Sequence, residues 1–181
     1  MLLRVPLLFA LCLLALPIVA PARLPVPFDP AGPLQVVIYD QVFPRADDAW
    51  TAPAYEQERF IALTGVLESR LHMAGITGEI TFERAGGSVP PATQRLEIIL
   101  QRWEVSPMSL DTSIVVDCHI QARLLVEDGV FDMGVFRGQD TRPRMRRELV
   151  EEDYRPAAEE AVTNMIRFYY MAMHDEPLSG E

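Results

Sequence analysis

The sequence predicts an α+β fold: a two-layer sandwich with two helices on one face of a mainly antiparallel β-sheet, in the order β-α-β-β-β-β-α. Three segments predict it. Residues 55–74 and the segment that begins at 153 carry apolar side chains at helical spacing. Between them, residues 112–125 alternate apolar and polar side chains, as a strand with one solvated face does. Packing both helices on one face would bury every apolar stripe in a single domain at 34–173.

The first 22 residues are typical of a secretory signal peptide. Met1–Arg4 carries one charge, Val5–Ala20 is an apolar run, and Ala20-Pro21-Ala22 fits a cleavage site. The run is shorter than a comfortable membrane span of roughly 20 residues, and an uncleaved anchor is the alternative. We therefore expect a periplasmic or secreted chain that begins near Arg23 and has no transmembrane span once the signal peptide is cleaved.

A proline-rich leader is predicted at 23–33, before the first strand at Leu34–Gln41. Val42–Pro53 is expected to be a loop, and Trp50 lies near its end. A helix follows at Tyr55–Ala74, with Gly75 placed to end it. Its apolar stripe comprises Phe60, Leu63, Leu67, Leu71 and Ala74, and its expected surface residues are Glu56, Glu58, Arg59, Glu68 and Arg70.

Four strands are predicted after this helix. The first two are Gly78–Arg84 and Arg95–Val105, the latter with Leu96, Ile98 and Leu100 facing inward. Thr112–Leu125 is the clearest strand, with Ile114, Val116, Cys118, Ile120, Ala122 and Leu124 on its apolar face. A hairpin turn at 127–129 leads to Val130–Arg137, where Phe131, Met133 and Val135 are expected to face inward and Gly134 to mark a bulge.

The polar stretch Gly138–Glu152 precedes the second predicted helix. Asp153 is the expected N-cap, because Pro156 is tolerated only in the first turn. The apolar stripe of this helix contains Ala158, Ala161, Met165, Phe168 and Ala172. Residues 174–181 are expected to form a flexible tail.

Composition excludes several kinds of function. The formal net charge of −10 disfavours nucleic acid as a partner, because phosphate binding needs a basic surface. Every basic residue is Arg, so Schiff-base chemistry and a standard P-loop are excluded, and the bias is typical of a bacterial GC-rich gene. Only Cys118 would remain after cleavage, so no intramolecular disulfide can form. We expect no cofactor and no metal site.

Candidate chemistry is sparse. Cys118 and His119 are neighbours, but successive side chains of a strand point to opposite faces, so Cys118 is expected in the core. Asp117 and His119 share the polar face and could form a catalytic or binding pair, although such a row is more often a solvated or contact surface. Trp50 could anchor a partner or simply pack in the core.

An arginine cluster is the sharpest local feature of this acidic chain. It comprises Arg142, Arg144, Arg146 and Arg147. Guanidinium groups bind carboxylates and phosphates in a forked geometry, so an anionic lipid, lipopolysaccharide or an acidic protein would fit. The alternative is that the acidic residues at 148–153 neutralise the cluster within the chain.

Over Leu34–Met173, the order of elements resembles the lipopolysaccharide-assembly lipoprotein of the bacterial outer membrane and similar small envelope lipoproteins. The shared features are a signal segment, a helix after the first strand, the long hairpin Thr112–Arg137 and a closing helix that contains alanines. The chain departs from this family because no lipobox Cys follows the apolar run. The resemblance implies a non-enzymatic accessory or assembly role in the envelope.

Three functions are therefore predicted. The first is a non-enzymatic periplasmic or envelope protein that binds a protein or an anionic envelope component, through the polar sheet face, the arginine cluster or a free strand edge. The second is a small periplasmic hydrolase that uses the face of Asp117 and His119. The third is a lipid- or ligand-carrying module, which requires an apolar cavity between the sheet and the helices.

Overall fold

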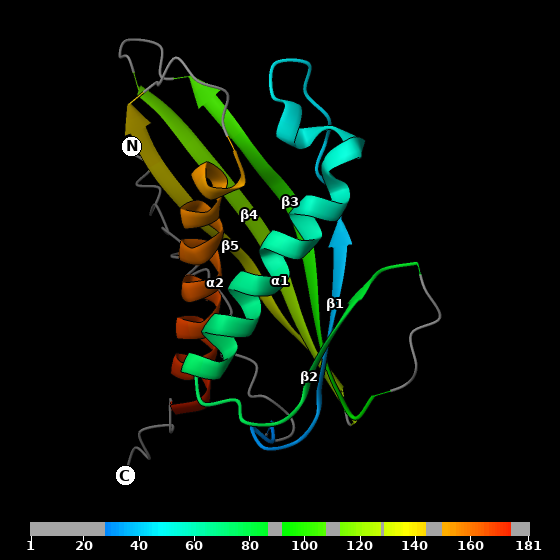
Figure 1. The fold of residues 1–181 in the computed structure, drawn as a ribbon. Coiled ribbons are helices and arrows are strands. Elements are labelled where there is room, and N and C mark those ends of the chain that lie inside the picture. The colour runs from blue at the N-terminus through cyan, green and yellow to red at the C-terminus, as the bar shows by residue number, and fades with distance from the viewer. Residues whose placement is uncertain (1–27, 87–91, 108–112, 128, 144–149, 175–181) are drawn as a thin grey trace, which may run out of the picture.

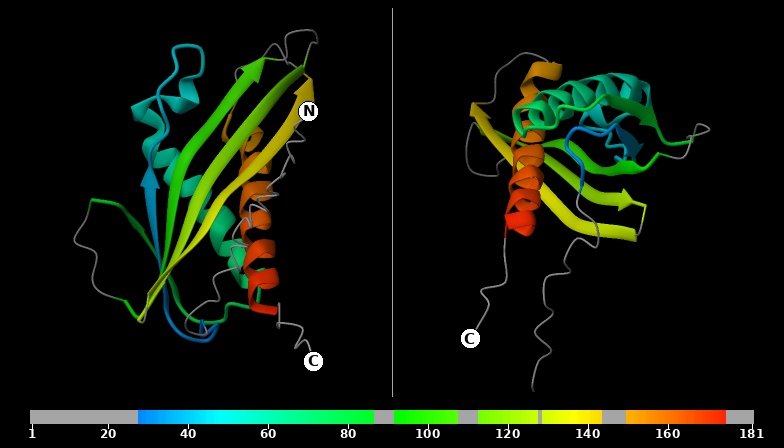
Figure 2. Two further views of the ribbon diagram at one scale, coloured as in Figure 1. Left: turned by 180° about the vertical axis from the view of Figure 1, so that it is seen from behind. Right: turned by 90° about the horizontal axis from the view of Figure 1, so that it is seen from below.

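The structure is a computed structural model that describes residues 28–86, 92–107, 113–127, 129–143 and 150–174. Its five strands form one sheet in the order β2-β1-β3-β4-β5, and two helices cover one face (Figures 1 and 2). The predicted fold class and element order are confirmed. The elements are β1 (Leu34–Asp40), α1 (Glu56–Met73), β2 (Ile80–Arg84), β3 (Gln94–Pro107), β4 (Ser113–Val126), β5 (Gly129–Pro143) and α2 (Glu151–His174).

The sheet is mixed. β3, β4 and β5 form an antiparallel meander, and Val126 pairs with Gly129 at the predicted hairpin turn. β1 runs parallel to both of its neighbours, β2 and β3. The parallel pair β1–β2 arises because α1 carries the chain across the sheet face before β2 begins (Figure 1).

A bulge in β5 corrects one prediction. Gly134 has a φ of 95° and pairs with Ala122, whereas Asp132 pairs with Arg123, so Met133 is the extra residue. Gly134 therefore marks a bulge, as predicted. Beyond it the alternation is reversed: Val135, which was expected to face inward, is 48% exposed, and Phe136 is buried instead. β5 also continues beyond Arg137 to Pro143, because β4 offers partners along its whole length.

A second irregularity lies in β3. Leu100 pairs with Ile120 and Arg102 pairs with His119, so Gln101 is bulged out of register. The shift turns Trp103 into the core, where it is fully buried and its indole Nε1 donates to the carbonyl of Tyr154 at 3.0 Å. The side chains predicted to face inward on β3 and β4 are buried: Leu96, Ile98, Leu100, Ile114, Val116, Cys118, Ile120, Ala122 and Leu124.

The helix predicted at 55–74 forms with its leucines buried, but one of its expected surface residues lies in the interior. Arg59 is 1% exposed. Its Nε donates to the Asp40 carboxylate at 2.7 Å, and its Nη1 donates to the carbonyls of Trp50 and Ala52. Placing Arg59 on the surface was wrong, because these acceptors lie in β1 and in the loop before α1.

α2 begins at Glu151, two residues before the predicted N-cap. Asp153 lies inside the first turn, where its carboxylate accepts from the backbone N–H of Val150 at 3.0 Å. Pro156 is therefore inside the helix. The helix packs on β5 through Ala157, Ala158 and Ala161, which are fully buried. None of the helices among the described residues is long and apolar enough to cross a membrane.

Candidate functional site

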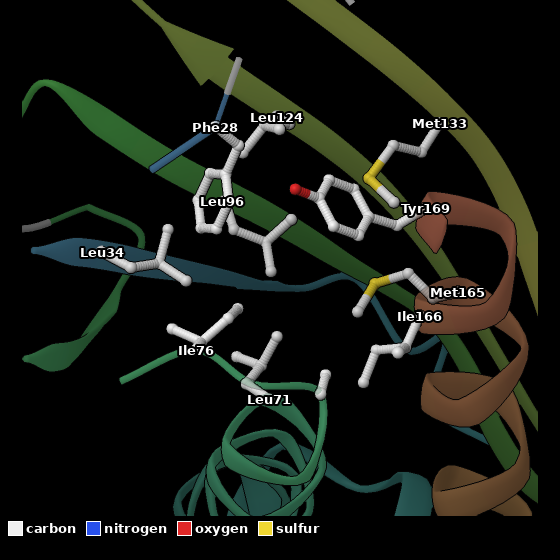
Figure 3. Close-up of a pocket in the computed structure, with 11 residues that line it drawn as sticks. Phe28, Leu34, Leu71, Ile76, Leu96, Leu124, Met133, Met165, Ile166 and Tyr169 are labelled. Carbon is white, nitrogen blue, oxygen red and sulfur yellow. The ribbon is translucent and has the colours of Figure 1, made fainter. Parts of the chain in front are cut away.

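An apolar pocket lies between the sheet and the helices, at the end of the molecule where both helices finish (Figures 1 and 3). The Tyr170 hydroxyl donates to the carbonyl of Ala74, which joins the two helix ends. The cavity volume is about 40 Å³. Its lining comes from the N-terminal segment, four strands, α1, the residues after α1, and α2: Phe28, Leu34, Leu71, Ala74, Ile76, Leu96, Leu124, Met133, Met165, Ile166 and Tyr169.

The lining is hydrocarbon and thioether apart from one side-chain hydroxyl, that of Tyr169. Burial raises the pKa of Tyr169 to about 12, so this hydroxyl stays protonated at physiological pH. The ring of Phe28 meets the ring of Tyr169 edge-on, with the centroids 5.7 Å apart. A cavity lined this way stays dry and accepts apolar groups. Met133 and Met165 are flexible side chains that can move to admit a larger group.

The sequence contains one signal for this pocket, and it lies in the predicted proline-rich leader. Phe28 belongs to the predicted leader, yet it is 6% exposed and lies against Tyr169. The backbone N–H of the next residue, Asp29, donates to the side chain of Gln94 on β3 at 2.7 Å. Phe28 is an isolated aromatic residue between Pro27 and Pro30, and this feature could have indicated that this part of the leader packs on the domain.

Asp117 and His119 lie on the outer face of the sheet, opposite the face that the helices cover. Each has its own cross-strand neighbours on β3 and β5. His119 lies between Arg102 of β3 and Arg137 of β5. Asp117 lies between Glu104 and Gln139, and its carboxylate accepts from the Gln139 side chain at 2.6 Å. No hydrogen bond joins Asp117 to His119, two described residues, so the pair is not assembled as an oriented general base.

The charged residues around His119 predict that the stability of the protein depends on pH. Burial lowers the pKa of His119, and Arg137 and Arg102 lower it further, while Asp117 and Glu104 oppose them. A lowered pKa means that the unfolded chain binds the proton more readily, so this residue reduces stability as the pH falls below about 6.5. We expect a His119→Gln variant to gain stability relative to the wild type between about pH 7.5 and pH 5.5.

Urea unfolding of both proteins at the two pH values measures this difference, and an NMR titration of His119 should give a pKa below its ordinary value. An equal response to pH in both proteins would contradict the prediction.

The remaining predicted site residues lie near the other end of α2. Trp50 is 5% exposed, with its ring stacked on Tyr154 at 4.8 Å, so it packs in the core. Arg142 on β5 binds the carboxylates of Asp140 and Asp153, the latter at 2.8 Å. Its acidic partners are thus supplied by the chain itself. Arg144, Arg146 and Arg147 lie outside the described residues.

The edge of β5 is partly occupied by α2. The backbone N–H of Gln139 donates to the Glu160 carboxylate at 2.7 Å, and the carbonyl of Arg137 accepts from the Asn164 side chain at 2.9 Å. An added strand would need these backbone groups, so the middle of this edge is protected against strand addition. The structure therefore separates the predicted residues and assembles a different site, the apolar pocket.

No family model matches the chain, and no curated protein matches it. The chain is similar in structure to a PelC dodecamer subunit from Paraburkholderia phytofirmans (TM-score 0.42, 13% identity, covering 78% of this chain and 90% of the other). It is also similar to a minor lipoprotein from Acinetobacter baumannii (0.43, 10% identity, 77% and 92%). A third likeness is to a lipoprotein from Neisseria meningitidis (0.43, 13% identity, 78% and 99%).

Two of these three structures are thus described as bacterial lipoproteins. Likenesses of this size carry no conclusion about function. The resemblance to the lipopolysaccharide-assembly lipoprotein stays a prediction.

Proposed function

We propose that this chain is a non-enzymatic protein of the bacterial cell envelope whose apolar pocket binds the hydrocarbon end of a lipid. The observation that carries the proposal is the lining of the pocket, where Tyr169 supplies the one side-chain hydroxyl among eleven residues. The signal-like segment at 1–22 supports export to the compartment where such lipids are found.

A bound hydrocarbon chain would enter the pocket by displacing side chains that now fill it. The rings of Phe28 and Tyr169 meet edge to face beside the cavity, and Phe28 itself lies outside the strands, before β1. Movement of Phe28 and rotation of the two methionines would lengthen the cavity for a chain end. Each buried methylene contributes about 0.8 kcal/mol, so burial of about ten methylenes would supply the roughly 8 kcal/mol that micromolar binding requires.

Two observations favour this function over the alternatives predicted from the sequence. Binding through the arginine cluster is weakened at Arg142, because Asp140 and Asp153 already hold its guanidinium. A hydrolase on the outer face would need an oriented His119, which Asp117 does not provide. Binding of an anionic envelope component stays a sequence-based prediction for Arg144, Arg146 and Arg147, which lie outside the described residues.

Binding of a fluorescent fatty acid to the purified chain tests the proposal, with native mass spectrometry to detect lipid carried over from the cell. An Ala74→Leu variant adds volume at the pocket wall and should weaken binding at least tenfold. Ala92→Leu, at an exposed position before β3, is the matched control and should bind as the wild type does.

A Met133→Ala variant enlarges the pocket and should bind more tightly or accept a longer chain. Circular dichroism checks that each variant is folded. Equal binding by the wild type and the Ala74→Leu and Met133→Ala variants would refute the pocket as the site.

A further inference from the structure

Near its C-terminal end, α2 is apolar over most of its circumference. From Ile166 to Ala172, Arg167 is the one charged side chain. A helix that is apolar on most of its faces normally lies in apolar surroundings on most of its sides. Here the sheet and α1 supply those surroundings on one side only (Figure 1).

The uncovered side presents large apolar side chains to solvent. Phe168 is 40% exposed, Tyr170 is 38% exposed and Met171 is 62% exposed. Met73, the last residue of α1, is 76% exposed. Because the Tyr170 hydroxyl contacts Ala74, next to Met73, these residues belong to one end of the molecule. We call Met73, Phe168, Tyr170 and Met171 the apolar rim.

The rim surrounds the end that contains the pocket. Tyr169 lines the pocket, and its ring lies 5.9 Å from that of Tyr170. On the other side of α2, Phe168 stacks on Phe131 of β5, with the centroids 6.4 Å apart. A flat apolar partner that covered the rim would therefore also cover the pocket.

The chain outside the structure indicates which partner this is. The apolar run Val5–Ala20 precedes Phe28 by eight residues, and Phe28 lies in the pocket at this same end. Eight residues span at most about 28 Å. In the alternative in which the apolar run stays uncleaved as an anchor inserted in a bilayer, the rim is held close to the bilayer surface. Tyrosine side chains are also favoured at membrane–water interfaces.

We infer that the apolar rim docks on a lipid bilayer, with the end of α2 lying in the interface. The inference rests on the proposed function in one respect: docking would bring the pocket to the acyl chains that it is proposed to bind. With Arg167 as the one charge in these turns, binding should depend little on anionic lipid.

An environment-sensitive fluorophore placed on the rim tests the docking. The full chain with Cys12→Ser and Met171→Cys is labelled at residue 171, because the buried thiol of Cys118 has a raised pKa and does not react. The matched control carries the label through Ile61→Cys, at a position that is 57% exposed in the early part of α1. Vesicles of phosphatidylethanolamine and phosphatidylglycerol, with and without brominated lipid, are then added.

We expect a blue shift and quenching by brominated lipid for the label at 171, and no change for the label at 61. Equal signals at both positions would mean that the N-terminal run alone binds the vesicle, and would overturn the inference. A blue shift at 171 that depends on protein concentration without vesicles would overturn it in favour of a second copy of the chain.

Adding Ala74→Leu to the chain labelled at 171 separates the two proposals. Loss of fatty-acid binding with docking retained is expected if both are correct. Fatty-acid binding without any vesicle response would leave the pocket proposal standing and refute the docking alone.

Discussion

Replacing Arg59 by methionine is expected to lower the free energy of unfolding by about 3–5 kcal/mol. The guanidinium is 1% exposed and joins three segments of the chain. It pairs with Asp40 at the end of β1, and it donates to the carbonyls of Trp50 and Ala52 in the loop before α1. Methionine keeps much of the side-chain length but leaves the carboxylate and the carbonyls without their donor.

Urea unfolding followed by tryptophan fluorescence measures the loss, because Trp50 and Trp103 are both in the core. Arg59→Lys is the matched control: it keeps the charge near Asp40 but not the forked geometry, so we expect an intermediate loss. Ile61→Met, on an exposed face of the same helix, should be nearly neutral. A loss below about 1 kcal/mol for Arg59→Met would show that the buried ion pair does not hold the loop.

Replacing Gly138 by alanine is expected to destabilise the protein by about 3 kcal/mol or more. Gly138 lies on β5 directly beneath α2, and a Cβ there would overlap the carbonyl oxygen of Ala157 and the backbone nitrogen of Ala161. These are backbone atoms, so no side-chain rotation can relieve the overlap. The whole of α2 would have to move away from the sheet.

Gly134→Ala on the same strand is the matched control. Gly134 has a positive φ of 95°, but a Cβ there meets nothing within 4 Å. Alanine should cost only the backbone strain of about 1–2 kcal/mol. Losses of equal size for the two variants would show that close packing of α2 on β5 is not what requires glycine at 138.

Local patterns in the sequence were sufficient for most of the fold. The alternation along β4 predicted every buried apolar residue of that strand, because a strand without a bulge keeps its side-chain period of two. The same rule failed beyond Gly134, where the bulge reversed the alternation and Val135 turned outward. Even there, the glycine indicated where the irregularity would lie.

The candidate site was less predictable. The sequence raised a lipid-carrying module as one alternative, but no residue of the pocket was proposed as a site residue. The lining brings Phe28, Leu71, Leu96 and Met165 together from segments far apart in the chain. Each of these residues has an ordinary apolar side chain that any core could contain, so none signals a pocket by itself.

The existence and order of the helices and strands, and the apolar stripe of β4, could be predicted from sequence, because periodicity is a property of neighbouring residues. Tertiary structure alone decided that β1 lies parallel between β2 and β3, that Arg59 is buried, and that both helices finish beside one apolar pocket. These features depend on which distant segments meet. A charged side chain can be buried only where the fold supplies its acceptors, and a pocket exists only where several surfaces fail to fill the space between them.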